Sequence, residues 1–349
     1  AADYALVVTE VGQQAPDTFI LGRGSPLAPG EKVTPAFVEV LGGGQAKFSP
    51  VASANSSGRR TALANWIASP ENRLTSRVMV NRVWQHHFGR GIVRSPNDFG
   101  LLGDQPTHRD LLDYLAINFA QSGWRLKPLH KLMVLSNTYR QSAQGSKEAL
   151  AADPANDLFA HFNMRRLGAE ELRDTIHAVN GRLNLKMYGP GFYPEISQEV
   201  LAGQSVPGQG WGKTSVEDQA RRSIYIHVKR SLVTPLLAAF DFPETDTSCE
   251  ARFNTTQPGQ ALAMLNGDFA NREAAAFAQR LQREAGDDLA AQVKLGLRIA
   301  LSREPQAAEV DRGLKLIKTL QEKYGQSAEV ARNHFCLYVL NLNEFTYLD

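Results

Sequence analysis

The stretch TSRVMVNRVWQHHF, residues 75–88, decides the fold of the central part of this chain. When it is drawn as a helix at about 100° per residue, two of its sides are apolar. One broad sector carries Leu74, Val78, Trp84 and Phe88, and the opposite side carries Met79, Val80 and Val83. A helix with two apolar sides needs cover on both, so this stretch is predicted to lie centrally in an array of helices.

Three polar side chains interrupt the first apolar sector at helical spacing, and we call them the polar ladder: Arg77, Asn81 and Gln85. A buried amide or guanidinium group needs hydrogen-bonding partners, because burial without them is unfavourable. One hypothesis is therefore structural, with the polar ladder bonded to loop backbone in Ser95–Gly103. The other is functional, with the polar ladder forming the floor of a ligand-binding pocket.

Outward from this stretch, the apolar spacing is helical over most of the chain from Gly58 onward. Gly89 and Gly123 stand where helix C-terminal glycines are expected. The fold is therefore predicted to be mainly α, a multi-helix globular array. The predicted helices are Thr61–Ala68, Thr75–Phe88, His108–Gln121, Pro128–Tyr139, Ala169–Leu183, Gly259–Leu265, Asp268–Ala285, Leu289–Leu301, Ala307–Tyr324 and Ala328–Leu342.

Small β elements are predicted at the N-terminus and around residues 223–228. Tyr4–Val8 has the alternation of a strand, and Phe19–Leu21 is expected to pair with it. Prolines and glycines then break regular structure as far as Gly44, which predicts an extended connector. Ser223–Val228 alternates again, so Ile224, Ile226 and Val228 are expected to enter a core.

Three parts of the chain are predicted from these patterns. Residues 1–57 would form the N-terminal strand and connector, with the strand continuing a sheet of preceding sequence or of a second copy. Residues 58–250 would form a central helical domain that includes the strand at 223–228 and a Gly/Pro-rich excursion over Gly189–Gly212. Residues 251–349 would form a C-terminal helical subdomain packed on it.

The composition is that of a folded globular protein, since 43% of the 349 residues are hydrophobic. No apolar run approaches the roughly 18 residues that a membrane helix needs, so no membrane span is predicted. The formal net charge is only +2, and no nucleic-acid partner is predicted. Charge is nevertheless uneven, because seven arginines and one acid, Glu71, lie between Arg59 and Arg94, while Asp241–Glu250 is acidic.

The chain has two cysteines, Cys249 and Cys336. They could form one disulfide in an oxidising compartment or stay buried and reduced, and the sequence does not decide between these. No local motif lowers a thiol pKa, so a redox-active pair is not expected. A Cys-x-x-Cys-His motif is absent, so no covalently bound haem is predicted in this chain.

Metal and nucleotide sites are not predicted. His86 and His87 point about 100° apart on a helix, so they cannot bind one ion together, and neither they nor His108 has a carboxylate or cysteine at ligand spacing. Residues 208–214 imitate a phosphate-binding loop, but Pro207 occupies its first glycine position. His177 is expected to be a helix-surface histidine or a buried hydrogen-bonding one.

Several residues are candidates for chemistry. If the activity is hydrolysis, the candidate catalytic residues are Asp98, His108 and Glu344, because two carboxylates across a cleft are what glycoside hydrolysis needs. Asp98 could instead close an Asx turn, and Glu344 could pair with an arginine. The candidate ligand-binding residues are Arg77, Asn81, Gln85, Arg140, Arg222 and Arg230.

Two of these arginines suggest a basic groove. Arg222 and Arg230 are eight residues apart, so on a strand they would share one face. If that face met the end of the Thr75–Phe88 helix, the groove would select sulfated or uronate-bearing polymers, because Arg binds planar anionic groups bidentately. In the alternative, the arginines pair with Asp241, Glu244 and Asp246.

One long set of motifs runs through the central part of the chain: RVMVNRVWQHHFGRG (77–91), SPNDFG (95–100), PTH (106–108), SGWRLK (122–127) and SNTYRQ (136–141). Further motifs are Asp17-Thr18, Arg23-Gly24, Pro29-Gly30-Glu31, RRL (165–167) with Glu170, Arg173 and Asp174, RRSIY (221–225), Lys229-Arg230, TTQPGQA (255–261) and NEF (343–345). In these motifs the chain resembles the cytochrome-C-associated domain of unknown function 1553, also called PSD-one, a family best known from planctomycetes.

This resemblance implies an exported protein, periplasmic or on the cell surface of a Gram-negative-type bacterium. It also implies that the chain is the C-terminal part of a longer architecture with an upstream domain and a cytochrome-c-like module that could hold haem. The leading hypothesis is a binding or scaffold module for anionic polysaccharide or for such a domain. The alternatives are a carbohydrate-active or redox enzyme with a pocket near Arg77, Asn81, Asp98 and His108, or a purely structural envelope protein, so catalysis stays undecided.

Overall fold

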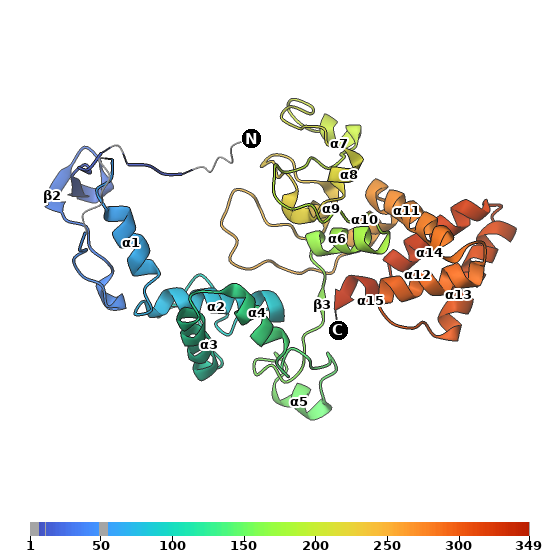
Figure 1. Ribbon diagram of the computed structural model, residues 1–349, viewed down its shortest axis with the longest axis horizontal. Coiled ribbons are helices and arrows are strands. Elements are labelled where there is room, and N and C mark those ends of the chain that lie inside the picture. The colour runs from blue at the N-terminus through green and yellow to red at the C-terminus, as the bar shows by residue number, and fades with distance from the viewer. Residues whose placement is uncertain (1–6, 11, 49–54, 349) are drawn as a thin grey trace. The chain divides into compact units, whose positions relative to one another are not determined.

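The computed structural model describes residues 7–10, 12–48 and 55–348 of the chain. It divides into two compact units, Ala1–Phe162 and Asn163–Asp349, which we call the first and the second unit. Each unit is described by itself below. The predicted mainly α fold with small β elements is confirmed (Figure 1).

A short hairpin occupies the N-terminal part of the first unit. Strand β1 (Thr18–Leu21) pairs antiparallel with β2 (Pro29–Val33), and Thr18 lies opposite Val33. The expected partner Tyr4–Val8 was wrong for its described residues, because 7 and 8 are not in a strand, while 4–6 lie outside the described residues. Strand β2 arises within the predicted connector, since a proline at the first position of a strand leaves the rest of the pairing intact.

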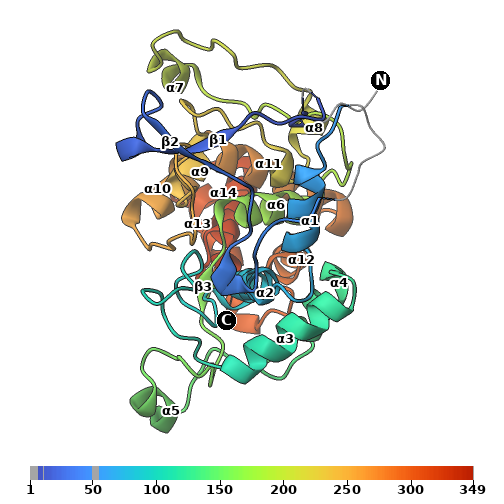
Figure 2. The same cartoon turned by 90° about the vertical axis from the view of Figure 1, so that its left-hand side faces the viewer.

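Two short 3-10 turns, η1 (Gly22–Gly24) and η2 (Glu39–Leu41), precede the α-helices in the described part of this unit. The α-helices that follow are α1 (Arg59–Ile67), α2 (Arg73–Phe88), α3 (Arg109–Gln121), α4 (Leu126–Val134) and α5 (Lys147–Ala152). Helix α2 packs against α3 and α4 (Figures 1 and 2). The side chain of Asn72 accepts from the backbone N–H groups of Leu74 and Thr75 and so starts α2, and Gly89 ends it with a φ of 78°.

The core of the first unit confirms the central place of α2. Val80, Trp84 and Phe88 of that helix are buried, together with residues of α3, α4 and the segment around Phe159. Helix α4 ends at Val134 instead of the predicted Tyr139. The reason is Ser136, whose hydroxyl donates to the Met133 carbonyl and accepts from the Tyr139 N–H, replacing helical hydrogen bonds with a turn.

In the described part of the second unit the α-helices are α6 (Ala169–Val179), α7 (Gln198–Ala202), α8 (Val216–Gln219), α9 (Pro235–Ala239), α10 (Pro258–Asn266), α11 (Asp268–Ala285), α12 (Leu289–Leu301), α13 (Ala307–Glu322), α14 (Ala328–Leu340) and α15 (Asn343–Thr346). The bounds predicted for α11 and α12 are confirmed. Strands β3 (Arg165–Arg166) and β4 (Tyr347–Leu348) pair antiparallel.

Helices α11 to α14 form the packed centre of the second unit (Figure 1). Phe277 and Phe335 are buried between them, and Gly296 and Gly313 allow their helices to approach Phe335 closely. A Cβ atom at Gly313 would lie 2.7 Å from Val293 Cγ1 and 2.8 Å from Phe335 Cε2, so no larger residue fits without a shift. Helix α6 joins this core through Leu172.

The strand predicted over Ser223–Val228 was wrong. Ser223–Tyr225 forms a 3-10 turn, η3, and only Ile226 makes an isolated bridge, to Phe192. Ile224 is 77% exposed and does not enter the core. The turn is fixed instead by Asp174, whose carboxylate accepts from the backbone N–H and the hydroxyl of Ser223, at 2.8 and 2.6 Å.

None of the helices in residues 7–10, 12–48 and 55–348 is both long and apolar enough to cross a membrane. The domain boundaries predicted at residues 57 and 250 stay predictions.

The two cysteines are free thiols with different environments, which makes a labelling prediction possible. Cys336 is fully buried, and burial raises the pKa of its thiol, whereas Cys249 is exposed. The native protein is therefore expected to react with one equivalent of a thiol reagent, and the urea-unfolded protein with two. Labelling of both thiols in the native protein would show that the α14 core opens readily.

Candidate functional site

The structure gives Asn81, the centre of the polar ladder, a backbone partner. Asn81 is fully buried, its Nδ2 donates to the Val93 carbonyl at 2.9 Å, and its Oδ1 accepts from the Val93 N–H at 2.8 Å. The structural hypothesis is confirmed for this residue, although the partner precedes the expected Ser95–Gly103 segment. Arg77 instead pairs with Asp113, with its Nε 2.6 Å from Oδ1, and Gln85 is half-buried.

The other candidates of the first unit also have local roles. Asp98 is exposed, and its Oδ1 accepts from the Gly100 N–H at 2.8 Å, as an Asx turn requires. His108 precedes α3 and its Nδ1 lies 3.0 Å from the hydroxyl of Thr107. Arg140 is exposed in the turn that follows α4. Ligand binding or catalysis by these residues stays a prediction.

The candidates of the second unit are likewise engaged. Arg230 is exposed, and its Nε lies 2.9 Å from Asp246 Oδ1, as the internal-pairing alternative expected. Arg222 interacts with the hydroxyl of Tyr225. Because η3 replaces the predicted strand, Arg222 and Arg230 do not share a strand face. Glu344 accepts two hydrogen bonds from Arg303, at 2.5 and 2.7 Å, again as the alternative expected.

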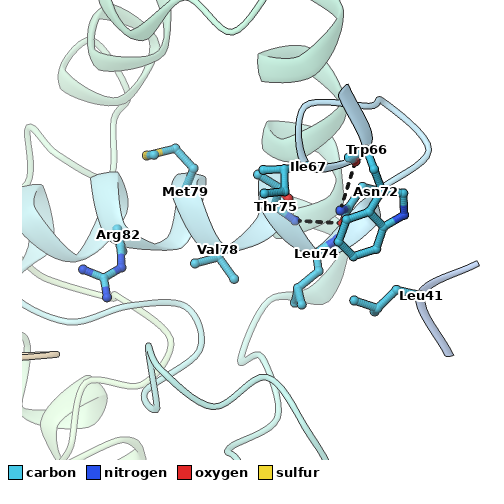
Figure 3. Close-up of a pocket in the computed structure, with 9 residues that line it drawn as sticks. All are labelled: Leu41, Trp66, Ile67, Asn72, Leu74, Thr75, Val78, Met79 and Arg82. Carbon is cyan, nitrogen blue, oxygen red and sulfur yellow. Dashed lines mark hydrogen bonds between the residues drawn. The ribbon is translucent and has the colours of Figure 1, made fainter. Parts of the chain in front are cut away.

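An apolar groove lies along α2 in the first unit, with a volume of about 380 Å³ (Figure 3). Trp66 and Ile67 of α1 line it, together with Leu74, Val78 and Met79 of α2. Its floor has little polar character, because Asn72 donates to the Trp66 carbonyl and caps α2. The groove therefore offers mainly apolar contact area, with Thr75 and Arg82 as the other polar residues of its lining.

A second cavity, in the second unit, combines burial with ionisable groups, and we call it the ionic pocket. Its volume is about 90 Å³, and it is lined by α6, α8, α11 and the segment before α7. The lining residues are Arg173, His177, Arg182, Pro194, Glu195, Val216, Gln219, Ala220, Phe269, Arg272 and Glu273.

Arg173 fixes one wall of the ionic pocket. Its Nη1 donates to the Arg221 carbonyl at 3.0 Å, its Nη2 donates to the Gln219 carbonyl, and its guanidinium stacks on Phe192 and Phe269. Burial lowers the pKa of Arg173 to about 10, against the opposing charges of nearby carboxylates, so the group stays charged at neutral pH.

Arg221 holds the adjoining chain in place. Its guanidinium donates to the carbonyls of Lys186, Tyr188 and Pro190, at 3.2, 2.6 and 3.0 Å. These bonds anchor the start of the Gly/Pro-rich excursion beside the pocket. Two arginines quoted for the family resemblance, Arg173 and Arg221, are thus structural supports of this site.

Glu273 is the hub of the ionic pocket and is 1% exposed. Its carboxylate accepts from Asn180 Nδ2 at 2.8 Å, Arg182 Nη1 at 3.1 Å and Arg272 Nε at 3.2 Å. Burial alone would raise the pKa of Glu273, but the nearby imidazole of His177 and the charges of the arginines outweigh it and hold the pKa well below its usual value. The carboxylate is therefore ionised at neutral pH.

His177 lies on α6 one turn after Arg173 and is 3% exposed. Its Nδ1 is 3.4 Å from Glu273 Oε2, and neither Nδ1 nor Nε2 makes a hydrogen bond with any of the described residues. Burial, opposed by the nearby carboxylate of Glu273, lowers the pKa of His177, so the imidazole is neutral at pH 7. Of the two alternatives expected for His177, the buried one is observed, but without the expected hydrogen bond among the described residues.

The mouth of the ionic pocket is closed by an ion pair. Arg272 Nη1 lies 3.1 Å from Glu195 Oε2, and both side chains are largely exposed, at 43% and 68%. The excursion that carries Glu195 is held by Gln219, whose Oε1 accepts from the Glu195 N–H at 3.0 Å, and by Trp211, which donates to the Pro194 carbonyl. The pocket therefore reaches the surface at a salt-sensitive contact.

The sequence did not predict the ionic pocket. The spacing of Arg173 and His177 at i and i+4 places both on one helix face, and this was the available signal. Glu273 lies on a distant helix, in a stretch whose pattern marks only an amphipathic surface helix. Among the described residues, no group of three or more His, Cys, Asp or Glu side chains is arranged to hold a metal ion.

Comparison with protein-family models gives a match over most of the chain. The model of the family described as "Protein of unknown function (DUF1553)", PSD1, matches residues 59–317, well over half of the chain. A search of curated proteins found no match, and neither did a search of solved structures.

Proposed function

The chain belongs to the DUF1553 family of proteins of unknown function, and from this premise we propose that it is a binding module for an anionic ligand. The ionic pocket of the second unit would receive one acidic group of that ligand, a carboxylate or a sulfate. The observation that carries the proposal is a cavity whose wall holds three arginines and the buried His177, neither of whose ring nitrogens is hydrogen-bonded among the described residues.

The charge of the ionic pocket supports an anion. Three guanidinium groups, of Arg173, Arg182 and Arg272, face the two carboxylates of Glu195 and Glu273, which leaves one net positive charge among the lining residues with His177 neutral. Asp174, outside the lining, lies 3.7 Å from Arg173. In a cavity screened from water, such a charge attracts an anion more strongly than it would at the surface. Guanidinium groups also match the planar geometry of carboxylates and the oxygens of sulfates.

The size of the ionic pocket limits what enters. A volume of about 90 Å³ corresponds to roughly three water molecules at about 30 Å³ each, which suits one acidic group but not a sugar ring. A pendant carboxylate or sulfate could therefore enter while the remainder of the ligand stays outside. Uronate-bearing and sulfated polysaccharides carry such groups repeatedly, and we propose them as the ligand class.

This proposal predicts a loss of affinity on changing the arginine at the mouth. Arg272→Gln is expected to weaken binding of a sulfated or uronate-bearing oligosaccharide at least about tenfold, since a hydrogen bond to a charged group contributes about 1.5–3 kcal/mol. The matched control is Arg283→Gln, an exposed arginine of the same helix α11. Isothermal titration calorimetry at low ionic strength measures both.

Salt provides the second arm of that test. Binding of the native protein should weaken as ionic strength rises, because the mouth is exposed to screening. Equal affinity of the Arg272 and Arg283 variants would place the anion elsewhere on the surface. Absence of binding to either polymer at low salt would reject the proposed function.

The proposed setting is the cell envelope, beside an upstream or cytochrome-c-like domain of the same architecture. This rests on the family resemblance alone. Fractionation of cells that express the full-length protein, with antibodies against this chain, tests it. Recovery with cytoplasmic markers would contradict an exported location.

A further inference from the structure

We propose that the ionic pocket binds its anion together with one proton, which His177 accepts on Nε2. This inference rests on the proposed function, since it concerns how the same pocket holds the same acidic group. It adds a coupling between ligand and pH to a site that would otherwise respond only to charge and salt. The geometry of three groups carries it: His177, Glu273 and the cavity between α6 and α11.

We place the proton of the neutral His177 imidazole on Nδ1. His177 Nδ1 faces the ionised carboxylate of Glu273 at 3.4 Å. A bare nitrogen lone pair in that position would repel the carboxylate, so the proton of the neutral imidazole belongs on Nδ1. The lone pair is then left on Nε2, which, like Nδ1, has no hydrogen-bonding partner among the described residues. A neutral His177 thus offers an acceptor, not a donor, to whatever occupies the cavity.

An anion in the ionic pocket would favour protonation of His177 Nε2. A carboxylate or sulfate oxygen beside the Nε2 lone pair would repel it, just as Glu273 would repel a bare Nδ1. Addition of a proton to Nε2 removes the repulsion and creates a charge-assisted hydrogen bond. The imidazolium would then lie between two anions, Glu273 on one side and the ligand on the other.

The surrounding charges determine when the proton is taken up. Helix α6 supplies Arg173, which faces His177, and Asp174, which lies beside Arg173. The turn after α6 supplies Arg182, and α11 supplies Arg272 and Glu273. The excursion supplies Glu195. Helix α8 contributes no charged side chain to the lining. In the free protein, burial and Arg173 keep His177 neutral. A bound anion reverses this balance because it brings a negative charge into the same cavity.

Anion binding and protonation of His177 favour each other. The pKa of His177 is lowered in the free protein and is raised when the anion is bound, so between the two values binding takes up one proton. In that window the affinity should fall about tenfold for each unit of rising pH. Below the pKa of the free protein the affinity should be independent of pH.

Calorimetry of the full chain tests this, with inorganic sulfate and free glucuronate as the probes. Titration at one pH in two buffers of different ionisation enthalpy gives the number of protons taken up per anion. The expected value is about one at neutral pH for the native protein. His177→Gln should bind without proton uptake and with an affinity independent of pH. His334→Gln, an exposed histidine of the same unit, should behave like the native protein.

The outcomes separate the two proposals. Binding with no proton uptake would overturn the coupling and leave the anion site standing. No binding of either probe, while an acidic polymer still binds, would show that the pocket is not where the polymer is held. If His177→Gln does not fold, the nitrogen resonances of His177 in the native protein decide: protonation of Nε2 on addition of sulfate is expected, and unchanged resonances would reject the coupling.

Discussion

Replacing Glu273 by Ala is expected to destabilise the second unit by about 3 kcal/mol. Removing one partner from a buried ionic group typically costs about 3–5 kcal/mol, because the remaining charges are left uncompensated. The lower end applies here, since Arg182 and Arg272 are partly exposed and can turn toward water. Asn180 and His177 are buried and cannot. Urea unfolding followed by circular dichroism measures the change.

The control for this variant is Glu284→Ala on the same helix. Glu284 pairs with Arg280 at i and i+4 on the surface, and such pairs contribute about 0.3–0.5 kcal/mol. The contribution of Glu273 should also depend on pH. Its pKa is lowered in the folded state, so its contribution is present above the unfolded pKa of about 4.3 and is lost as the pH falls toward the folded value. Equal destabilisation by both variants would show that Glu273 is not the hub of the pocket.

Replacing Asn81 by Leu is expected to destabilise the first unit by about 2–4 kcal/mol. Leucine is similar in size but cannot bond the backbone of Val93, which is itself 2% exposed. Each buried group left unsatisfied costs about 1–3 kcal/mol. The amide also packs closely against Gly91, since a Cβ atom added at Gly91 would lie 2.6 Å from Asn81 Nδ2.

Asn118→Leu is the matched control for Asn81→Leu. Asn118 is exposed on α3 and bonds only the Tyr114 carbonyl one turn back. Its replacement is expected to change the free energy of unfolding by less than about 0.5 kcal/mol. Thermal unfolding of the two variants side by side gives the comparison. A stable, fully folded Asn81→Leu protein would show that the 92–93 segment can find other partners.

The sequence predicted the helices well because their signal is local. Periodic apolar residues place α11 and α12 at their observed bounds and make α2 central, since burial of a stripe depends on spacing alone. The strand over Ser223–Val228 failed for the opposite reason. Its alternation is real, but contacts from Asp174 and Phe192, both distant in sequence, bend the chain into a turn that leaves Ile224 exposed.

The contrast between local signals and contacts distant in sequence also explains which candidate sites could be predicted. Asn81 could be predicted as buried and bonded because its own helix shows the conflict between an amide and an apolar sector. The ionic pocket could not, because it exists only where α6 and α11 meet and where Arg221 fixes the excursion. Arg230, which was predicted to contribute to a basic groove, is largely exposed and pairs with Asp246 at the surface.

The measurement that tests the central claim most directly is a crystal structure of the protein soaked in bromide, whose anomalous scattering locates anions. The expected result is a bromide ion in the ionic pocket, within hydrogen-bonding distance of His177 Nε2 and close to the guanidinium groups of Arg182 or Arg272. Occupancy should fall when the soak is made at alkaline pH, because the proton on His177 is then lost. Bromide confined to surface arginines, with none beside His177, would contradict the claim that this pocket is an anion site.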